Sequence, residues 1–170
     1  MKHLFSIVLL LAFGLGMKAQ NAAALPTCST PEFRQFDFWI GDWEVWAGDS
    51  IVGWNKVELI LDECVIMENW KGKGASRGKS FNLYNRQTEK WEQTWVDNYG
   101  SVIHFSGEYD EKKGVLSMTG TGKAQDGKEV QYTLSFWNNE DGTVRQLWQA
   151  SKTKGRNWVT LFDGLYKKKG

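Results

Sequence analysis

Residues 89–109, EKWEQTWVDNYGSVIHFSGEY, contain two runs in which the character of the side chain alternates at every position. One face of the first run combines tryptophan with amide and carboxylate side chains: Trp91, Gln93, Trp95 and Asp97. Alternation with a period of two is typical of a β-strand, and the residues Asn98-Tyr99-Gly100 between the runs are typical of a tight turn. This stretch therefore predicts a β-hairpin.

The same rhythm continues over the rest of the chain. It predicts ten strands, at 42–48, 51–62, 64–72, 77–86, 89–97, 101–109, 114–121, 128–138, 143–151 and 156–167. The breaks between them carry turn residues, among them Asp126-Gly127 and Asp141-Gly142. Both prolines, Pro26 and Pro31, precede the first strand, so no proline interrupts a strand ladder.

Ten consecutive strands joined by short turns indicate an all-β, up-and-down antiparallel sheet. A sheet of that length must protect its edges, and closure into a barrel removes them, so we expect a closed barrel. A β-sandwich is the alternative, but it needs longer crossing connections than this sequence has. The one predicted helix runs from Thr30 to Phe38, with Thr30 as N-cap, Pro31 in the first helical position and Glu32 in the first turn.

The N-terminus has the pattern of a secretory signal peptide. Lys2 and His3 precede an apolar run from residue 4 to 15, and small residues lead to a cleavage site near residue 20. The run is too short to span a bilayer, although an uncleaved anchor is the alternative. We therefore expect a signal peptide at 1–20, an approach segment at 21–41 and a barrel domain at 42–170, exported to a periplasm or secreted.

Charge and cysteine content narrow the partners. Without Lys2 and Lys18, the 21 basic residues fall to 19 against 20 acidic ones, a net charge of about −1 that favours neither nucleic acid nor a membrane surface. The two cysteines, Cys28 and Cys64, favour a disulfide in an oxidising compartment, and the alternative is two buried thiols that do not meet. A bridge would close a loop of about 35 residues and stabilise the fold by about 3 kcal/mol. Two cysteines and one histidine outside the signal, His104, make a metal site unexpected.

One face of most strands mixes tryptophan with amide, hydroxyl or carboxylate side chains. If that face points inward, the barrel encloses an amphipathic cavity; if it points outward, the tryptophans are surface residues. We favour the inward orientation, because ten exposed tryptophans would be costly. In strand 128–138 we assign the same role to Gln131, Thr133, Ser135 and Trp137. The candidate ligand-binding residues are Glu68, Trp70, Asn82, Tyr84, Gln93, Trp95, Asp97, Gln146 and Trp148.

Glu68 and Asp97 are the two carboxylates on the proposed inner face. Burial would raise their pKa values and suit them to acid–base work, but we favour the simpler role of anchoring hydrogen bonds to Trp N–H groups or to neighbouring amides. His104 shares a strand face with Val102 and Ser106, and a lone histidine is more often a polar surface residue than a haem or metal ligand.

Several motifs resemble known families. Gly41-Asp42-Trp43 resembles the Gly-x-Trp signature of lipocalins and the wider calycin group, in which the Trp closes the narrow end of the barrel. A longer pattern resembles a bacterial family of exported domains to which no activity is attached. It consists of Phe36-Asp37-Phe38-Trp39-x-Gly41-x-Trp43, Cys64, Glu68-Asn69-Trp70, Ser80-x-Asn82-x-Tyr84 and Trp91-x-Gln93-x-Trp95-Val96-Asp97.

The resemblance implies that the N-terminal aromatic cluster is a plug, with Trp43 at the barrel floor. In lipocalins an arginine near the last strand stacks on this Trp, and Arg145 or Arg156 is the candidate here, although neither follows the final strand. Nitrobindin, a ten-stranded haem barrel, is similar in strand count. It uses a histidine late in its chain, whereas this sequence has none after His104, which argues against haem. We expect no cofactor.

Three functional hypotheses remain open at this point. The first is an exported barrel that binds a small, partly apolar, ring-containing molecule. The second is an isomerase or hydrolase that uses Glu68 or Asp97 as acid or base, and the third is a structural domain with a filled core. Of these we favour the binding protein, with the enzyme and the structural domain as alternatives.

Overall fold

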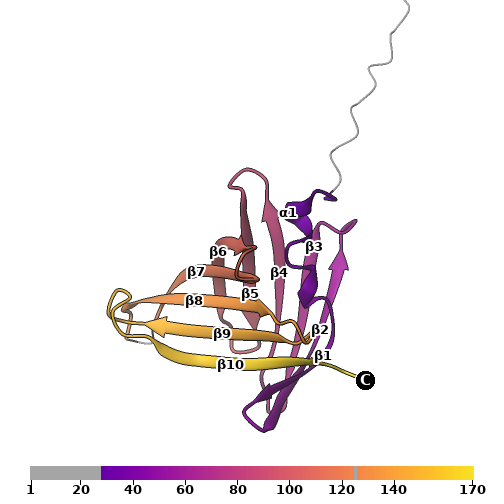
Figure 1. Cartoon of the computed structure of the whole chain (residues 1–170). Coiled ribbons are helices and arrows are strands. Elements are labelled where there is room, and N and C mark those ends of the chain that lie inside the picture. The colour runs from indigo at the N-terminus through magenta and orange to yellow at the C-terminus, as the bar shows by residue number, and fades with distance from the viewer. Residues whose placement is uncertain (1–27, 125) are drawn as a thin grey trace, which may run out of the picture.

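The structure, a computed structural model, describes residues 28–124 and 126–170. Ten antiparallel strands close into a barrel in which β1 pairs with both β2 and β10 (Figure 1). The strands are β1 (Gly41–Ala47), β2 (Ser50–Ile60), β3 (Val65–Gly72), β4 (Arg77–Asn85), β5 (Lys90–Asp97), β6 (Val102–Asp110), β7 (Val115–Lys123), β8 (Glu129–Asn138), β9 (Val144–Ser151) and β10 (Val159–Lys168). The predicted closed up-and-down barrel is confirmed. The signal peptide predicted at 1–20 lies outside the described residues.

Because consecutive strands run in opposite directions, their connections alternate between two ends of the barrel. We call one the closed end; it carries the N-terminal helical segment and the connections 61–64, 86–89, 111–114 and 139–143. The other, the open end, carries the connections 48–49, 73–76, 98–101, 124–128 and 152–158. Gly100 and Gly142 have φ of 81° and 77°, a left-handed conformation that glycine adopts without strain, as the predicted turns require. No helix in the described part of the chain is long and apolar enough to cross a membrane.

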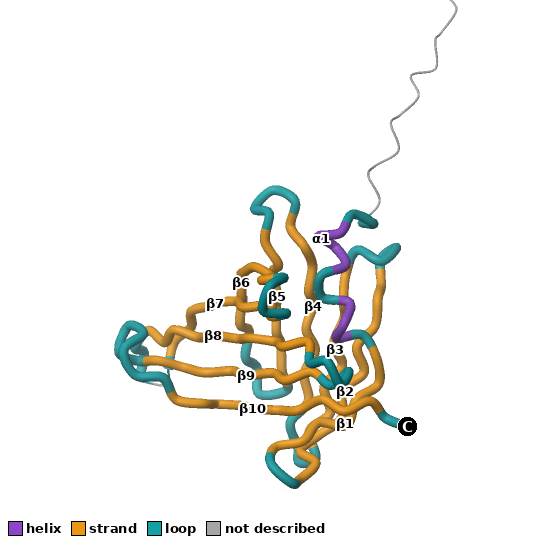
Figure 2. The backbone as a smooth tube through the Cα atoms, viewed as in Figure 1, coloured by secondary structure: helices purple, strands orange, loops and turns teal. Residues whose placement is uncertain are grey.

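The N-terminal helical segment is shorter and more irregular than the sequence predicts. It consists of α1 (Pro31–Arg34) and a 3₁₀ turn, η1 (Asp37–Trp39), and α1 contacts β4 (Figure 2). Thr30 occupies the predicted N-cap position, with Pro31 and Glu32 in the first turn as expected, although the Thr30 side chain makes no capping hydrogen bond. The helix stops before Phe36, whose φ of −107° turns the chain and allows both Phe36 and Trp39 to enter the barrel.

These two rings form an aromatic plug with three others: Trp43, Trp91 and Phe136. All five side chains are buried. Phe36 stacks on Trp39 with ring centroids 4.9 Å apart, and both rings contact Phe136. Trp43 donates a hydrogen bond from Nε1 to the carbonyl oxygen of Trp39 at 2.8 Å, which fixes η1 against β1. The aromatic cluster therefore seals the closed end of the barrel.

The cation over Trp43 is a residue that we did not predict. Lys168, at the end of the last strand, places Nζ 5.8 Å from the centroid of the Trp43 ring. Arg145 lies instead over Trp137 on the outer wall, and Arg156 belongs to a connection at the open end. Neither of the two predicted arginines therefore covers Trp43.

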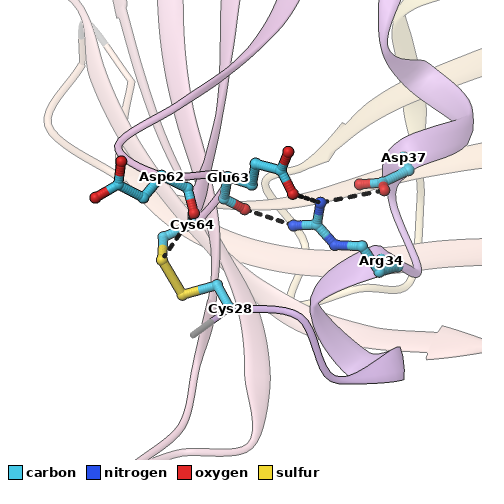
Figure 3. A network of polar contacts seen from close by, with 6 residues as sticks. All are labelled: Cys28, Arg34, Asp37, Asp62, Glu63 and Cys64. Carbon is cyan, nitrogen blue, oxygen red and sulfur yellow. Dashed lines mark hydrogen bonds and ion pairs between the residues drawn. A yellow bond between two sulfur atoms is a disulfide. The ribbon is translucent and has the colours of Figure 1, made fainter. Parts of the chain in front are cut away.

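A disulfide and a group of charged residues fasten the N-terminal segment to the closed end (Figure 3). Cys28 and Cys64 are bonded, as predicted. The guanidinium of Arg34 lies 3.4 Å from the carboxylate of Asp37 and 3.6 Å from that of Glu63, and it also donates to the carbonyl oxygen of Glu63. These contacts join α1 and the approach segment to the connection between β2 and β3.

The predicted inner face of β8 is wrong. Val130, Leu134 and Phe136 of the opposite face are buried, and Leu134 pairs with Trp148 while Phe136 pairs with Gln146. Directly paired residues point to the same side of a sheet, so β8 turns its aliphatic and aromatic face inward. Its outer face carries the four residues that we assigned to the interior: Gln131, Thr133, Ser135 and Trp137.

Candidate functional site

The interior contains a cavity of about 240 Å³ that reaches the open end. Exposed side chains from the open end, Tyr99 and Leu161, stand at its mouth, and the buried Glu68 lies at its floor. One enclosed water needs a volume of only about 15 Å³, so the cavity is large enough for a small molecule. The lining residues are Glu68, Trp70, Ser76, Gln93, Trp95, Asp97, Tyr99, Phe105, Leu134, Gln146, Trp148, Leu161, Phe162 and Tyr166.

Most of the predicted site residues meet at this cavity. Seven of the nine line it, and they come from β3, β5 and β9: Glu68, Trp70, Gln93, Trp95, Asp97, Gln146 and Trp148. The other two do not. Asn82 is buried behind the floor, and Tyr84 packs at the closed end against Phe33 and Trp91. Alternation placed both on the inner face correctly but could not say how far along the barrel they lie.

A chain of hydrogen bonds runs through the middle of the barrel and ends at the carboxylate of Glu68. Gln93 Nε2 donates to Asn82 Oδ1 at 2.6 Å, and Asn82 Nδ2 donates to Ser80 Oγ at 2.9 Å. Ser80 Oγ then donates to Glu68 Oε2 at 2.7 Å, while Asn55 Nδ2 donates to Glu68 Oε1 at the same distance. Each donor thus points toward Glu68. A buried network in which every bond has one direction holds its members in fixed positions.

Glu68 is buried, and its environment changes its acidity. Burial raises the pKa of its carboxyl from an ordinary value of 4.5 to about 7, although the hydrogen bonds from Ser80 and Asn55 act in the opposite direction. The hydroxyl of Tyr166 is a second acid close to Glu68. Burial, and after it the charge of Glu68, raises the pKa of Tyr166 well above its usual range. The Tyr166 hydroxyl donates to Gln146 Oε1. The floor of the cavity therefore holds one carboxyl that exchanges its proton near neutral pH.

The aromatic walls lie flat against the barrel because glycines stand beneath them. A Cβ on Gly53 would come within 2.5 Å of the Trp70 ring, and one on Gly78 within 2.2 Å of the Trp95 ring. In the same way, a Cβ on Gly164 would come within 2.5 Å of the Phe162 ring. Larger residues at these glycines would push the rings into the lumen. The size of the cavity therefore depends on these glycines as well as on the rings that line it.

Asp97 has a structural role at the mouth of the cavity. Its Oδ1 accepts hydrogen bonds from the backbone N–H groups of Tyr99 and Ser101, and its Oδ2 accepts one from Trp95 Nε1 at 3.3 Å. Burial acts to raise the pKa of Asp97, but these hydrogen bonds outweigh it and the pKa is lowered. Asp97 thus stays ionised, orders the connection between β5 and β6 and orients the Trp95 ring. This is the anchoring role that we favoured.

Several residues of the site escaped the sequence analysis. Asn55 and Ser80 hold Glu68, and Tyr166 holds Gln146. The aromatic or aliphatic members are Phe105, Leu134 and Phe162. Ser80 was visible as a neighbour of Asn82 on one strand face. The aliphatic and aromatic members carried no signal, because their pattern is that of an ordinary core.

His104 lies away from the cavity. It is exposed on the outer wall, where its Nδ1 is 3.0 Å from Thr94 Oγ1. Within residues 28–124 and 126–170, no three His, Cys, Asp or Glu side chains are grouped so that they could hold a metal ion.

No protein-family model and no curated protein matches this chain.

Proposed function

We propose that this protein is a binding protein for a small, partly apolar, ring-containing molecule, which enters the barrel at the open end. The observation that carries the proposal is the cavity of about 240 Å³, with aromatic walls and a hydrogen-bonded polar floor. Ligand sites are typically concave and mostly apolar, with a few polar groups that fix orientation. A filled core, the third hypothesis, does not account for this space.

The chemistry of the lining supports a flat ligand. Trp70, Trp95 and Trp148 stand around the lumen, and each indole offers a broad face for stacking. Glu68, Gln93 and Gln146 offer polar atoms beneath them. The volume lies just below the range of about 300–1,000 Å³ that is common for drug-sized ligands, so one or two rings would fit.

Export and family membership are parts of the same proposal. The bonded Cys28 and Cys64 support an oxidising compartment, which agrees with a cleaved signal peptide and a periplasmic or secreted protein. The plug around Trp43 supports the resemblance to lipocalins, in which a Trp has this place.

The direct test is an unbiased search for the ligand. Purified protein is denatured, and the released small molecules are identified by mass spectrometry; the ligand-free protein is then titrated with them while its tryptophan emission is recorded. We expect quenching in the wild type and at least ~10-fold weaker binding in Trp95→Leu, which loses one wall. Trp137→Leu is the matched control, because Trp137 lies on the outer wall. Equal losses in the two variants would count against binding in the cavity.

A second candidate function is proton transfer on a bound molecule, as in an isomerase or hydrolase. The observation that favours it is a buried carboxyl at the cavity floor whose pKa is about 7, which suits a general acid or base near neutral pH. Glu68→Gln should then abolish turnover while binding of a neutral substrate remains measurable. Turnover that survives this substitution would exclude Glu68 as the acid or base.

A further inference from the structure

We propose that the ligand is a small cation, a protonated amine carried on a ring-bearing group. This inference names the ligand class of the proposed binding site and rests on that function. Three features of the cavity favour a cation: the charges in its lining, the acceptors at its floor and the position of its rings.

The charges in the lining have one sign. Two of the fourteen lining residues are carboxylates, Glu68 at the floor and Asp97 at the mouth, and none is Lys, Arg or His. The whole chain has 21 Lys and Arg residues against 20 Asp and Glu, so the lack of bases is local to the cavity. A buried anion would meet two like charges and no opposite one, which carries a large free-energy penalty. A buried cation would be paired.

The hydrogen bonds leave acceptors for the ligand. Gln93 and its neighbours use their N–H groups to donate toward Glu68, so the Gln93 Oε1 atom has no partner among the described residues. Glu68 can only accept when it is ionised. Donors also remain, among them Gln146 Nε2, because Gln146 Oε1 accepts from Tyr166, and the buried Trp148 Nε1, which has no partner among the described residues. Glu68 and Gln93 Oε1 are acceptors at the polar floor, and they suit the part of a ligand that carries several N–H groups, as an ammonium does.

The rings add a second attraction for a cation. Trp70, Trp95 and Trp148 line the cavity between the two carboxylates. The face of an indole is the strongest aromatic partner for a positive charge, and the attraction grows where water is excluded. Asp97 contributes through its charge, because its carboxylate oxygens already accept hydrogen bonds from Tyr99, Ser101 and Trp95.

The test compares three probes that share a ring and a chain length but differ in charge: 2-phenylethylamine, 2-phenylethanol and phenylacetate. Their dissociation constants are measured by calorimetry at pH 8 with wild type, Glu68→Gln and Glu108→Gln. We expect the wild type to bind the amine at least ~10-fold more tightly than the alcohol and to bind phenylacetate most weakly. Glu68→Gln should lose most of the preference for the amine and keep its affinity for the alcohol. Glu108→Gln, which removes the same charge from the exposed outer wall, should match the wild type.

The outcomes separate this inference from the function on which it rests. The proposal of a cationic ligand is wrong if the alcohol or phenylacetate binds as tightly as the amine, or if Glu68→Gln keeps the preference for the amine. Small-molecule binding would stand in either case. If none of the probes binds, the molecule released from the purified protein decides: an amine supports the inference and a neutral or anionic molecule overturns it. If no probe binds and no molecule is released, both proposals fail.

Discussion

At the scale of single residues, the barrel interior depends on where one charge and a few glycines lie. Glu68 is held by Asn55 and Ser80 in a place where water does not reach freely. Gly53 and Gly78 let two indoles lie flat on the wall. Each of these features keeps a polar atom or a volume available to a ligand, and each can be tested by a single substitution.

The raised pKa of Glu68 predicts a specific pH dependence of stability. Between its ordinary value of 4.5 and its folded value of about 7, the folded protein holds a proton that the unfolded chain releases. The contribution of this group to stability is therefore fully present below pH 4.5 and is lost as the pH rises to about 7. The loss amounts to about 3 kcal/mol.

Urea denaturation at several pH values checks this prediction by comparing wild type with Glu68→Gln, which cannot titrate at this position. The free energy of unfolding of the wild type, relative to the variant, should fall by about 3 kcal/mol from pH 4.5 to pH 8. Other carboxyl groups change both proteins equally and cancel in the difference. A difference that stays constant or rises with pH would contradict a raised pKa.

Gly78→Ala should narrow the cavity without removing any polar group. The new Cβ would lie 2.2 Å from the Trp95 ring and 2.9 Å from the carbonyl oxygen of Val96, so the ring must move toward the lumen. We expect at least ~10-fold weaker binding of the co-purified ligand, or of 2-phenylethylamine, by calorimetry, and a stability loss of about 1–3 kcal/mol. Gly74→Ala is the control, because no atom lies within 4 Å of its new Cβ. Unchanged affinity in Gly78→Ala would mean that the Trp95 ring does not limit the ligand.

At the scale of elements, contacts with the N-terminal segment hold the connection between β2 and β3 in place. Leu61, Asp62 and Glu63 all have positive φ, between 50° and 65°, a conformation that costs about 1–2 kcal/mol for each non-glycine residue. The disulfide from Cys64 and the contacts of Arg34 with Glu63 join this strained turn to the N-terminal segment. The segment and the turn therefore stabilise each other.

Removal of the disulfide should weaken the closed end. A bridge across 36 residues contributes about 3–4 kcal/mol in the chain-entropy account, so the double variant Cys28→Ser, Cys64→Ser should lose about that much free energy of unfolding. Urea denaturation with and without reductant measures the loss. The wild type in reductant should match the double variant, and the double variant should not respond to reductant. A loss below about 1 kcal/mol would show that Arg34 and the aromatic plug suffice.

The strands could be predicted from the sequence, but the sequence did not always indicate which face of a strand points inward. Turn residues such as Asp141-Gly142 mark the ends of strands, so element bounds were close to those observed. In β8 both alternating sets contain a large aromatic residue, Phe136 or Trp137, and only the pairing of Phe136 with Gln146 decides which set faces inward. The position of a residue along the barrel axis has no local signal at all. That is why Tyr84 was assigned to the cavity although it packs at the closed end.

At the scale of the whole molecule, the two ends of the barrel differ in structure. The closed end carries the helical segment (Figure 1). It also contains the aromatic plug and the disulfide, so contacts between residues far apart in the sequence hold its strands together. The open end has the cavity and exposed apolar side chains such as Tyr99 and Leu161 at its mouth. The hydrogen-bonded layer around Glu68 separates the two. A ligand that enters from the open end would meet rings first and polar atoms last.

This division predicts where a ligand changes hydrogen exchange. Binding stabilises the folded state by mass action, and local openings that break the site become rarer. We expect amides in the strand ends around Trp70, Trp95 and Trp148 to exchange more slowly when the co-purified ligand or 2-phenylethylamine is added. Amides in the connections 61–64 and 111–114 at the closed end should be unaffected, because the ligand does not reach them. Exchange measured by mass spectrometry on peptides from both ends checks this, with Gly78→Ala as the variant in which the effect should shrink. Greater slowing at the closed end would place the ligand outside the cavity, because protection by direct binding is strongest where the ligand contacts the chain.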